Sequence, residues 1–276
     1  MSGEHWGRRP RDWANLAEPS NEPLFAEVLN ALGAGAGVRL LDIGCGSGYA
    51  ARMAAALGAR VAGIDITPEL LAIARKRVPA AEFVEGGMDE LPFPDGTFDA
   101  AVGFNAFQFA DDPGRAVTEA ARVVRRGGLV AATTFAEPER NESTALHLAL
   151  EPLRPAPGGT GRAGRAGRAG RATTHAPYAL SDPGGLERLL AGAGLEPVSS
   201  GEVPLVWAHA NAEDAIRAVL ASGGGALAIE HSGEGAAHRA LSDAVVPFTR
   251  ADGTVSMRNV FRYAVARRPD REARHG

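Results

Sequence analysis

The chain has 276 residues, of which 45% are hydrophobic, and a formal net charge of −4. It is long enough to bury one large core, and its slight acidity gives no reason to expect nucleic acid as a partner. No apolar run reaches the roughly 18 residues of a membrane-spanning helix, and the N-terminal residues contain no apolar stretch suited to export. A single cysteine, Cys45, cannot form an internal disulfide. We therefore expect a cytoplasmic protein.

The first half of the chain alternates short apolar runs with helical segments. Strands are predicted at 38–43, 60–65, 81–85, 98–104 and 129–135, and helices at 49–57, 67–77 and 112–126. Thr67-Pro68-Glu69 and Asp112-Pro113 supply helix starts, and Gly127-Gly128 reads as a turn before the fifth strand. This alternation predicts an α/β fold, a parallel sheet with helices on both faces.

The second half of the chain interrupts this pattern twice. Residues 137–181 are rich in Pro, Gly and Arg, and GRAGRAGRAGRA at 161–172 is expected to form a loop. A helix at 181–193 and strands at 196–207 and 255–266 return to the sheet, and two helices are expected within 208–252. The fold expected is a Rossmann-like, seven-stranded, mostly parallel sheet with two lid-like insertions. Its predicted parts are an N-terminal helical segment (1–36), a core (37–135), an insertion (136–181), a return to the core (182–207), a helical insertion (208–252), and the last strand and tail (253–276).

The strongest chemical signal is the sequence LLDIGCGSG at 40–48, an apolar strand that ends in Asp42 and is followed by glycines at alternate positions. A glycine-rich turn between strand and helix lets a ligand approach the backbone. The dinucleotide pattern GxGxxG would require glycine at position 49, where this chain has Tyr49. A nicotinamide-dependent dehydrogenase is therefore disfavoured. For the glycine triplet alone, a tight turn without a ligand stays possible.

Two further carboxylates follow neighbouring strands. Asp65 ends the second predicted strand, 21 residues after Gly44, where a carboxylate can bind two ribose hydroxyls. Met88-Asp89 follows the third strand, where the methionine could pack on an adenine ring and the carboxylate could accept from its amino group. The three loops meet at one sheet edge and favour an adenosine-containing ligand over an empty turn.

In these motifs the chain resembles the class I methyltransferases that use S-adenosylmethionine (SAM), especially the ubiquinone/menaquinone-biosynthesis-like group that methylates small molecules. The likeness covers roughly 37–135, through LLDIGCGSG, GIDIT, GGMDELPFPDGTFDAAVGFNAFQF and ARVVRRGGLVAATTF. It implies SAM as the cofactor and 37–135 as the SAM-binding core. Carried over by position, it implies cofactor contacts from Asp42, Gly44, Cys45, Gly46, Gly48, Asp65, Ile66, Met88, Asp89 and Asn105.

The segment after the fourth strand departs from that group. Many members have a histidine a few residues beyond this strand, whereas this chain reads Asn105-Ala106-Phe107-Gln108-Phe109. No catalytic acid or base is therefore assigned, and Asn105 and Gln108 are the candidates for positioning the acceptor. The acceptor-pocket candidates are Trp13, Phe107, Gln108, His175, Trp207 and His209, although each aromatic side chain could equally lie in the core.

The function expected is transfer of a methyl group from SAM to O, N or C of a small molecule, possibly in secondary or quinone metabolism. The alternative is a protein of this fold that binds the cofactor without methyl transfer, as a cyclase-like enzyme or as a partner or sensor subunit. The seven histidines show no metal-ligand spacing, so no metal is expected. The partner expected is a small-molecule acceptor, and the assembly a monomer or a homodimer.

Overall fold

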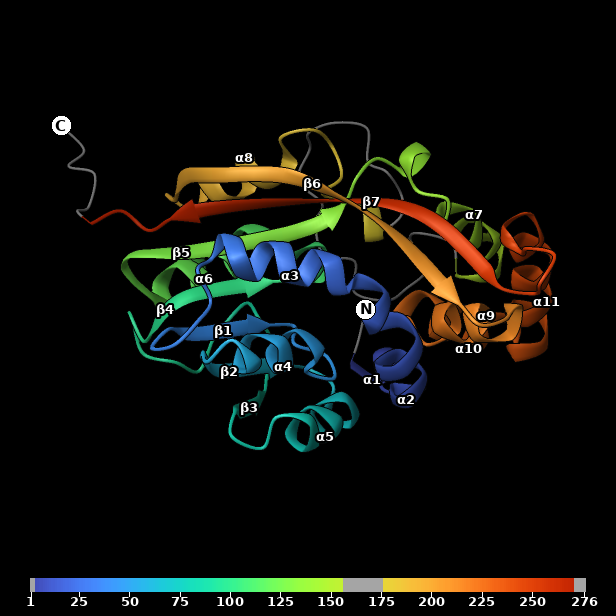
Figure 1. Cartoon of the computed structure of the whole chain (residues 1–276), viewed down its shortest axis with the longest axis horizontal. Helices are drawn as coiled ribbons and strands as arrows, with labels where there is room; N and C mark the ends of the chain where they lie inside the picture. Colours follow the sequence, from blue (N-terminus) through green and yellow to red (C-terminus); the bar gives the residue numbers. More distant parts are fainter. Residues whose placement is uncertain (1–2, 156–175, 271–276) are drawn as a thin grey trace.

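The computed structural model describes residues 3–155 and 176–270. Its centre is a seven-stranded sheet in the order β3-β2-β1-β4-β5-β7-β6 (Figure 1). β7 pairs antiparallel with both neighbours, and the other pairs are parallel, so the expected Rossmann-like, mostly parallel sheet is confirmed. The strands are β1 (Arg39–Ile43), β2 (Arg60–Asp65), β3 (Glu82–Glu85), β4 (Phe98–Gly103), β5 (Val124–Phe135), β6 (Glu196–His209) and β7 (Val255–Arg267).

Helices cover both faces of this sheet. One face carries α3 (Glu22–Ala31), α4 (Tyr49–Ala56) and α5 (Pro68–Arg77), and the other carries α6 (Pro113–Val123) and α8 (Gly185–Gly192). Successive strand residues alternate between the two cores, as Leu40 and Leu41 illustrate, because side chains of a strand point to opposite faces. The two apolar layers fix the C-terminal ends of β1, β2 and β4 at one edge, where glycine and carboxylate loops follow.

A helical cap stands beyond that edge, on a third apolar core. It consists of α7 (Thr144–Ala149), α9 (Ala212–Leu220), α10 (Gly223–Ser232) and α11 (Glu234–Val245). The long strands β6 and β7 extend past the rest of the sheet to reach it (Figure 1). The two sequence excursions therefore pack together as one cap.

The second excursion contains three α-helices, so the expectation of two was wrong. One of them, α10, begins with Gly223, Gly224 and Gly225, residues that disfavour a helix. Ser222 caps it by accepting a hydrogen bond from the amide of Gly225. A Cβ on Gly225 would lie 2.4 Å from the carbonyl oxygen of Val219, so the close approach of α9 and α10 requires glycine there.

The fifth strand also differs from the prediction. α6 ends at Val123, not near Arg126, and β5 begins at Val124 with a register shift opposite Phe98 and Ala100. Gly127 adopts a φ of +72° within this irregularity and bonds to the carbonyl of Arg268, so the glycine pair bends a strand instead of preceding it.

The N-terminal segment, residues 3–21, lies between the cap and the sheet edge. Its ion pairs with the cap join Arg8 to Glu230 at 2.6 Å and Asp12 to Arg217. It is made of short turns that bury few side chains of their own, and these contacts hold it in place. The short helices in chain order are α1 (Gly3–Trp6), α2 (Pro10–Asp12), η1 (Trp13–Ala17), η2 (Glu18–Asn21), η3 (Phe107–Phe109), η4 (Pro138–Arg140), η5 (Glu151–Leu153), η6 (Ala176–Tyr178) and η7 (Val246–Phe248).

The repeat at 161–172 and His175 lie outside the described residues, so the structure does not bear on their predicted roles.

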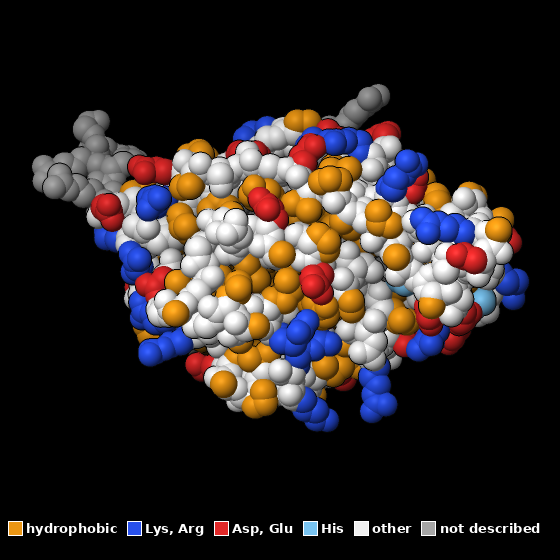
Figure 2. Space-filling model, viewed as in Figure 1, with side chains coloured by type: hydrophobic (Ala, Val, Ile, Leu, Met, Phe, Trp, Pro, Cys, Tyr) orange, Lys and Arg blue, Asp and Glu red, His pale blue; other side chains and the backbone are white. Residues whose placement is uncertain are grey.

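On the face shown in Figure 2, acidic and basic side chains are interspersed instead of forming one basic patch. Within residues 3–155 and 176–270, no helix has the length and apolarity needed to cross a bilayer. The division into six parts stays a prediction.

Candidate functional site

A cavity of about 460 Å³ lies between the sheet edge and the cap. Its sheet side is formed by residues at the ends of β1, β2 and β4, and its cap side by α7, α9, α10 and the end of β6. The N-terminal segment closes it between these two sides, through Trp6, Trp13 and Glu18 among others. Of the site residues predicted from the sequence, Trp13, Asp42, Gly44, Cys45, Gly46, Asp65, Ile66, Met88, Asn105, Gln108, Trp207 and His209 line this cavity.

The glycine loop is shaped by backbone conformations that favour glycine. Gly44 and Gly46 have φ values of +70° and +54°. A Cβ on Gly46 would lie 2.6 Å from a carboxylate oxygen of Glu18, so a side chain there has no room. Gly48 is not among the residues that line the cavity, and a Cβ on it would lie 2.9 Å from the Cβ of Ala74. Its role is close packing of the loop on α5.

Asp65 holds the glycine loop in place. One of its carboxylate oxygens accepts from the amide of Gly46 at 2.9 Å, and the other accepts from the amide of Thr67 at 2.9 Å. Burial raises the pKa of Asp65, and these backbone donors oppose the rise. Asp65 therefore links the loops that follow β1 and β2, and it also faces the cavity.

Asp42 is buried at the end of β1 with both carboxylate oxygens lacking a hydrogen-bond partner among the described residues. Burial raises its pKa to about 8, and the neighbouring carboxylates of Glu18 and Asp65 add to the rise. Three acids thus converge beside the glycine loop. A buried carboxylate without partners requires a proton or a positively charged ligand.

Glu18 is a site residue that the sequence analysis missed. It is 6% exposed, and its carboxylate accepts from the amide of Ser47 at 2.8 Å and from Nε1 of Trp13 at 3.0 Å. It also pairs with the guanidinium of Arg77 at 3.0 Å. Burial outweighs these contacts and raises its pKa. The sequence around Glu18 carries no motif, and only the fold brings it to the loop.

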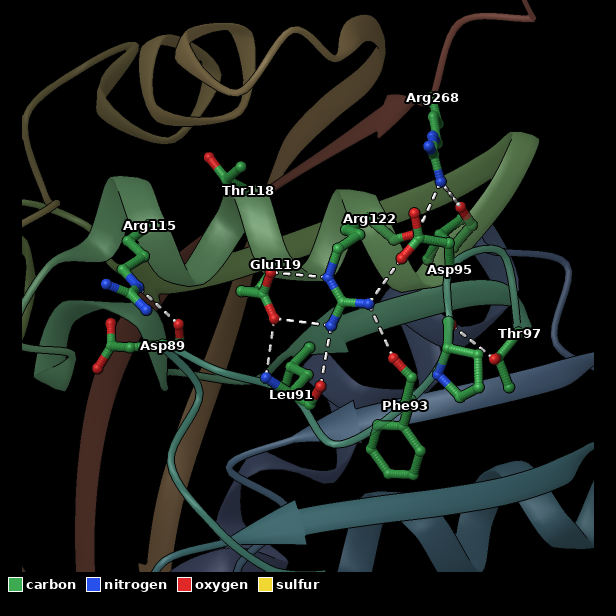
Figure 3. A network of polar contacts seen from close by, with 12 residues as sticks. Asp89, Leu91, Phe93, Asp95, Thr97, Arg115, Thr118, Glu119, Arg122 and Arg268 are labelled. Atoms are coloured by element: carbon green, nitrogen blue, oxygen red, sulfur yellow. Dashed lines mark hydrogen bonds and ion pairs between the residues drawn. The ribbon is translucent and has the colours of Figure 1, made fainter.

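Arginine side chains of α6 hold the loop that follows β3 in place (Figure 3). Arg122 donates to the carbonyls of Leu91 and Phe93 at 2.9 and 2.8 Å, and Arg115 donates to the carbonyl of Asp89 at 2.8 Å. These bonds fix the backbone that carries Met88 into the cavity. The side chain of Asp89 does not line the cavity, so its expected cofactor contact lacks support in this geometry.

The segment after β4 brings two amide side chains to the cavity. Asn105 has a φ of +48°, and Thr133 accepts from its amide at 2.9 Å. Gln108 is 6% exposed, and neither atom of its amide has a hydrogen-bond partner among the described residues. Phe107 is fully buried in the core shared with α6, its ring packed under Gly103. The expectation that Phe107 forms a pocket wall is corrected accordingly.

The cap side of the cavity is mostly apolar and aromatic. The ring of Phe135 packs against those of Trp207 and His147, each with centroids 5.9 Å apart. Trp207 donates to the side chain of Asn21 at 3.3 Å. Burial lowers the pKa of His209, which favours the neutral ring. Arg154, which the sequence analysis also missed, adds a guanidinium to this side.

Residues 41–132 match the family model described as a methyltransferase domain. This segment is therefore similar to methyltransferase domains. It contains the glycine loop, Asp65, Met88 and Gln108, so the family match covers the sheet side of the cavity. Domains of this family use SAM, which confirms the expected cofactor class and supports the expectation of an enzyme.

Among curated relatives, the malonyl-[acyl-carrier protein] O-methyltransferase of Pectobacterium atrosepticum is 34% identical over 130 residues. The match covers 47% of this chain and 50% of that protein. The chain thus spans about half the length of the curated relatives that it matches. The cap lies outside the segment that matches the family model.

Solved structures share the fold over more of the chain. A candidate methyltransferase from Bacillus halodurans C-125 superposes with a TM-score of 0.58 at 19% identity, covering 89% of this chain and 98% of that one. The [4+2]-cyclase SpnF superposes with a TM-score of 0.56 at 22% identity, covering 89% of this chain and 80% of that one. At these identities the likeness concerns the fold alone.

The residues around the glycine loop fit a SAM molecule chemically. SAM carries positive charge on its sulfonium and its ammonium, and the partnerless carboxylate of Asp42 beside Glu18 and Asp65 provides a negative field for it. Within the described residues, no group of three or more His, Cys, Asp or Glu side chains is arranged to hold a metal ion.

Proposed function

We propose that the protein transfers a methyl group from SAM to an oxygen, nitrogen or carbon atom of a small-molecule acceptor held between the sheet edge and the cap. The observation that carries the proposal is the continuity of the cavity from the acidic glycine loop to an apolar chamber under the cap. In this arrangement Asp42, Gly44, Cys45, Gly46, Asp65, Ile66, Met88 and Asn105 contact the cofactor, and Trp13, Gln108, Trp207 and His209 face the acceptor.

The protein's main contribution is positioning. Transfer of a methyl group from a sulfonium neutralises the leaving group, so alignment of the acceptor and exclusion of water supply much of the rate enhancement. Gln108 orients the acceptor through its unpartnered amide, which can donate and accept a hydrogen bond. The apolar walls from Trp13 and Trp207 keep water away from the reacting atoms.

The acceptor's class is the finer part of the proposal. The resemblance to the quinone-biosynthesis-like group favours a small molecule of quinone or secondary metabolism. The curated relative acts, by its name, on malonyl-[acyl-carrier protein], a different acceptor. The cap has its own apolar core and supplies the chamber's walls, so we assign acceptor choice to it.

Isothermal titration calorimetry with SAM, S-adenosylhomocysteine (SAH) and NADH tests the cofactor part. The parent should bind SAM and SAH but not NADH, and Gly46→Val should abolish both, since a side chain there meets Glu18. Gly233→Val, at another positive-φ glycine with open space around it, controls for backbone strain in general. If Gly46→Val bound SAH as well as the parent does, the loop assignment would be wrong.

Incubation with methyl-labelled SAM and acceptor libraries tests transfer itself. Label should move to an acceptor and SAH should accumulate in equal amount. Cofactor binding without transfer to any acceptor, together with conversion of an acceptor in the presence of SAH, would favour the alternative of a cyclase-like enzyme.

A further inference from the structure

Arg154 is a partly buried cation on the cap side of the cavity. Its Nε donates to the carbonyl of Gly224 at 3.1 Å, at the first turn of α10. Its two terminal nitrogens have no hydrogen-bond partner among the described residues, and no carboxylate of those residues forms an ion pair with it. Burial lowers the pKa of its guanidinium. The negative charge of Glu151 opposes this decrease without forming a hydrogen bond to Arg154. The planar fork of Arg154 is therefore available to a ligand.

Charge is distributed unequally around the cavity. Glu18, Asp42 and Asp65 line it from the N-terminal segment and the sheet, where a cationic cofactor fits. Arg154 is the single Lys or Arg among the described residues that line it, and it enters from the cap. Burial of a cation in an apolar chamber without a partner carboxylate is unfavourable unless a bound anion balances its charge. The structure thus separates a site for positive charge from a site for negative charge.

The chamber can compensate one negative charge but not two. His209, which lines the cavity from the end of β6, is driven toward its neutral form by burial. A phosphate monoester would bring close to two charges against one guanidinium, with three acids elsewhere in the same cavity. A carboxylate brings one charge, and its two oxygens match the guanidinium fork.

We propose that Arg154 binds a carboxylate of the methyl acceptor, so that the substrate is an apolar molecule with a single negative charge. This proposal rests on the proposed function, because it assigns the cap side of the same cavity to the acceptor. The carboxylate anchors one end of the acceptor at α10, and the remainder lies against Phe135, Trp207 and Leu227.

Gly224 keeps the fork of Arg154 in this position. A Cβ at residue 224 would lie 2.7 Å from a terminal nitrogen of Arg154, so Gly224→Ala displaces the fork while the positive charge remains. Alanine also favours the helix more than glycine does, so this variant should fold at least as well as the parent.

The probes are 3-phenylpropanoate, its amide, and 2-phenylethyl phosphate, titrated into SAH-saturated protein by ligand-observed NMR. We expect the carboxylate to bind at least about fivefold more tightly than the amide and the phosphate. Arg154→Gln should remove the preference, Arg154→Lys should retain part of it, and Gly224→Ala should weaken carboxylate binding. Arg239→Gln, an exposed arginine of α11 outside the cavity, is the matched control and should leave all three affinities unchanged.

SAH calorimetry on every variant keeps the two proposals apart. Arg154→Gln should bind SAH within about twofold of the parent, because it does not touch the glycine loop. Equal binding of amide and carboxylate by the parent, an unchanged preference in Arg154→Gln, or no probe binding at all would overturn the role of Arg154. A preference for the phosphate would overturn the single-charge assignment. If the parent protein itself did not bind SAH, that result would instead refute the proposed function.

Discussion

The carboxylate of Glu18 accepts a hydrogen bond from the backbone amide of Ser47 at 2.8 Å, although 29 residues separate the two in the chain. Through this bond the N-terminal segment reaches the centre of the glycine loop. Arg77, from the last turn of α5, reinforces it by donating to the carbonyl oxygen of Ser47 at 3.0 Å and to Glu18. The shape of the glycine loop therefore depends on Glu18, a residue outside the segment that matches the family model.

Glu18→Gln should destabilise the protein and weaken SAH binding. Glutamine supplies one acceptor oxygen where four donors now converge, and it leaves Arg77 without its buried partner. Breaking a buried ion pair costs about 3–5 kcal/mol. Urea unfolding measures the loss. Glu22→Gln, an exposed glutamate that bonds Tyr49, is the control and should change stability by less than about 1 kcal/mol. Equal effects of the two substitutions would contradict the assigned role of Glu18.

Asp42 should couple SAM binding to proton release. Its pKa of about 8 means that most of the ligand-free protein carries a proton there at pH 7. A cationic ligand favours the carboxylate, so binding at pH 7 should release a proton, and the apparent affinity should rise with pH up to about 8. Calorimetry in buffers of different ionisation enthalpy counts the protons. An observed enthalpy independent of the buffer would exclude this coupling.

The same residue should make stability depend on pH. The folded pKa of Asp42 exceeds the ordinary value of 3.8, so the folded state binds more protons than the unfolded chain between about pH 4 and 8. The contribution of Asp42 to stability therefore falls as pH rises through that window. Asp42→Asn carries no charge at any pH. Its melting temperature should exceed the parent's by about 2 °C or more at pH 8 but not at pH 4, while its SAH affinity decreases.

Asp65→Ala should lower SAH affinity by about 10²-fold or more, since a carboxylate that accepts two ribose hydroxyls contributes a few kcal/mol. The structure adds a second reason, because the substitution also frees the amides of Gly46 and Thr67. Asp65→Asn retains one acceptor oxygen, so its SAH affinity should lie between those of the parent and Asp65→Ala. An unchanged dissociation constant for Asp65→Ala would exclude the ribose role.

Local pattern predicts the sheet well because its strands are short apolar runs between glycine turns. β1, β2 and β3 begin and end within one residue of the expected bounds. The sequence failed where tertiary contact overrides a local signal. Gly223 to Gly225 disfavour a helix but begin α10, and Gly127-Gly128 suggest a turn but form a bulge in β5.

The cofactor loop could also be predicted from local pattern, because its residues are contiguous in the sequence. Its glycines are required by the positive φ values of the loop backbone. Glu18 and Arg154 could not be predicted. Each is a charged residue in a short irregular segment, and its importance arises from burial against partners that are distant in sequence. Phe107 shows the opposite error, because its place in the sequence next to the site predicts a pocket wall, whereas its side chain lies in the core.

Gln108→Leu should stabilise the ligand-free protein and slow turnover. Both atoms of the Gln108 amide are buried without a partner among the described residues, so an apolar side chain of similar size removes a desolvation cost. The acceptor loses an orienting hydrogen bond, which typically contributes about 1–3 kcal/mol, or roughly 5- to 150-fold in rate. Single-turnover rates and thermal unfolding measure the two effects. A less stable variant with parental turnover would contradict both expectations.

The segment after β4 should supply no general base, so turnover should depend on positioning and on the acidity of the acceptor. Between Gly103 and Phe109 the polar side chains are Asn105 and Gln108, and neither amide takes up a proton near neutral pH. The competing model uses a histidine, and the structure places His147 and His209 at the cavity while His175 lies outside the described residues. Each should therefore be replaced by glutamine and assayed in single turnover across pH.

A histidine base would give a rate that rises with pH up to its pKa, because the ring must be unprotonated to accept the proton. For His209 that rise would lie below its ordinary value of 6.5, since burial lowers its pKa. The positioning model expects losses below about tenfold for each substitution and no removal of a pH limb. A loss above about 10³-fold at one histidine, accompanied by disappearance of the rising limb, would establish that residue as the base and overturn the positioning model.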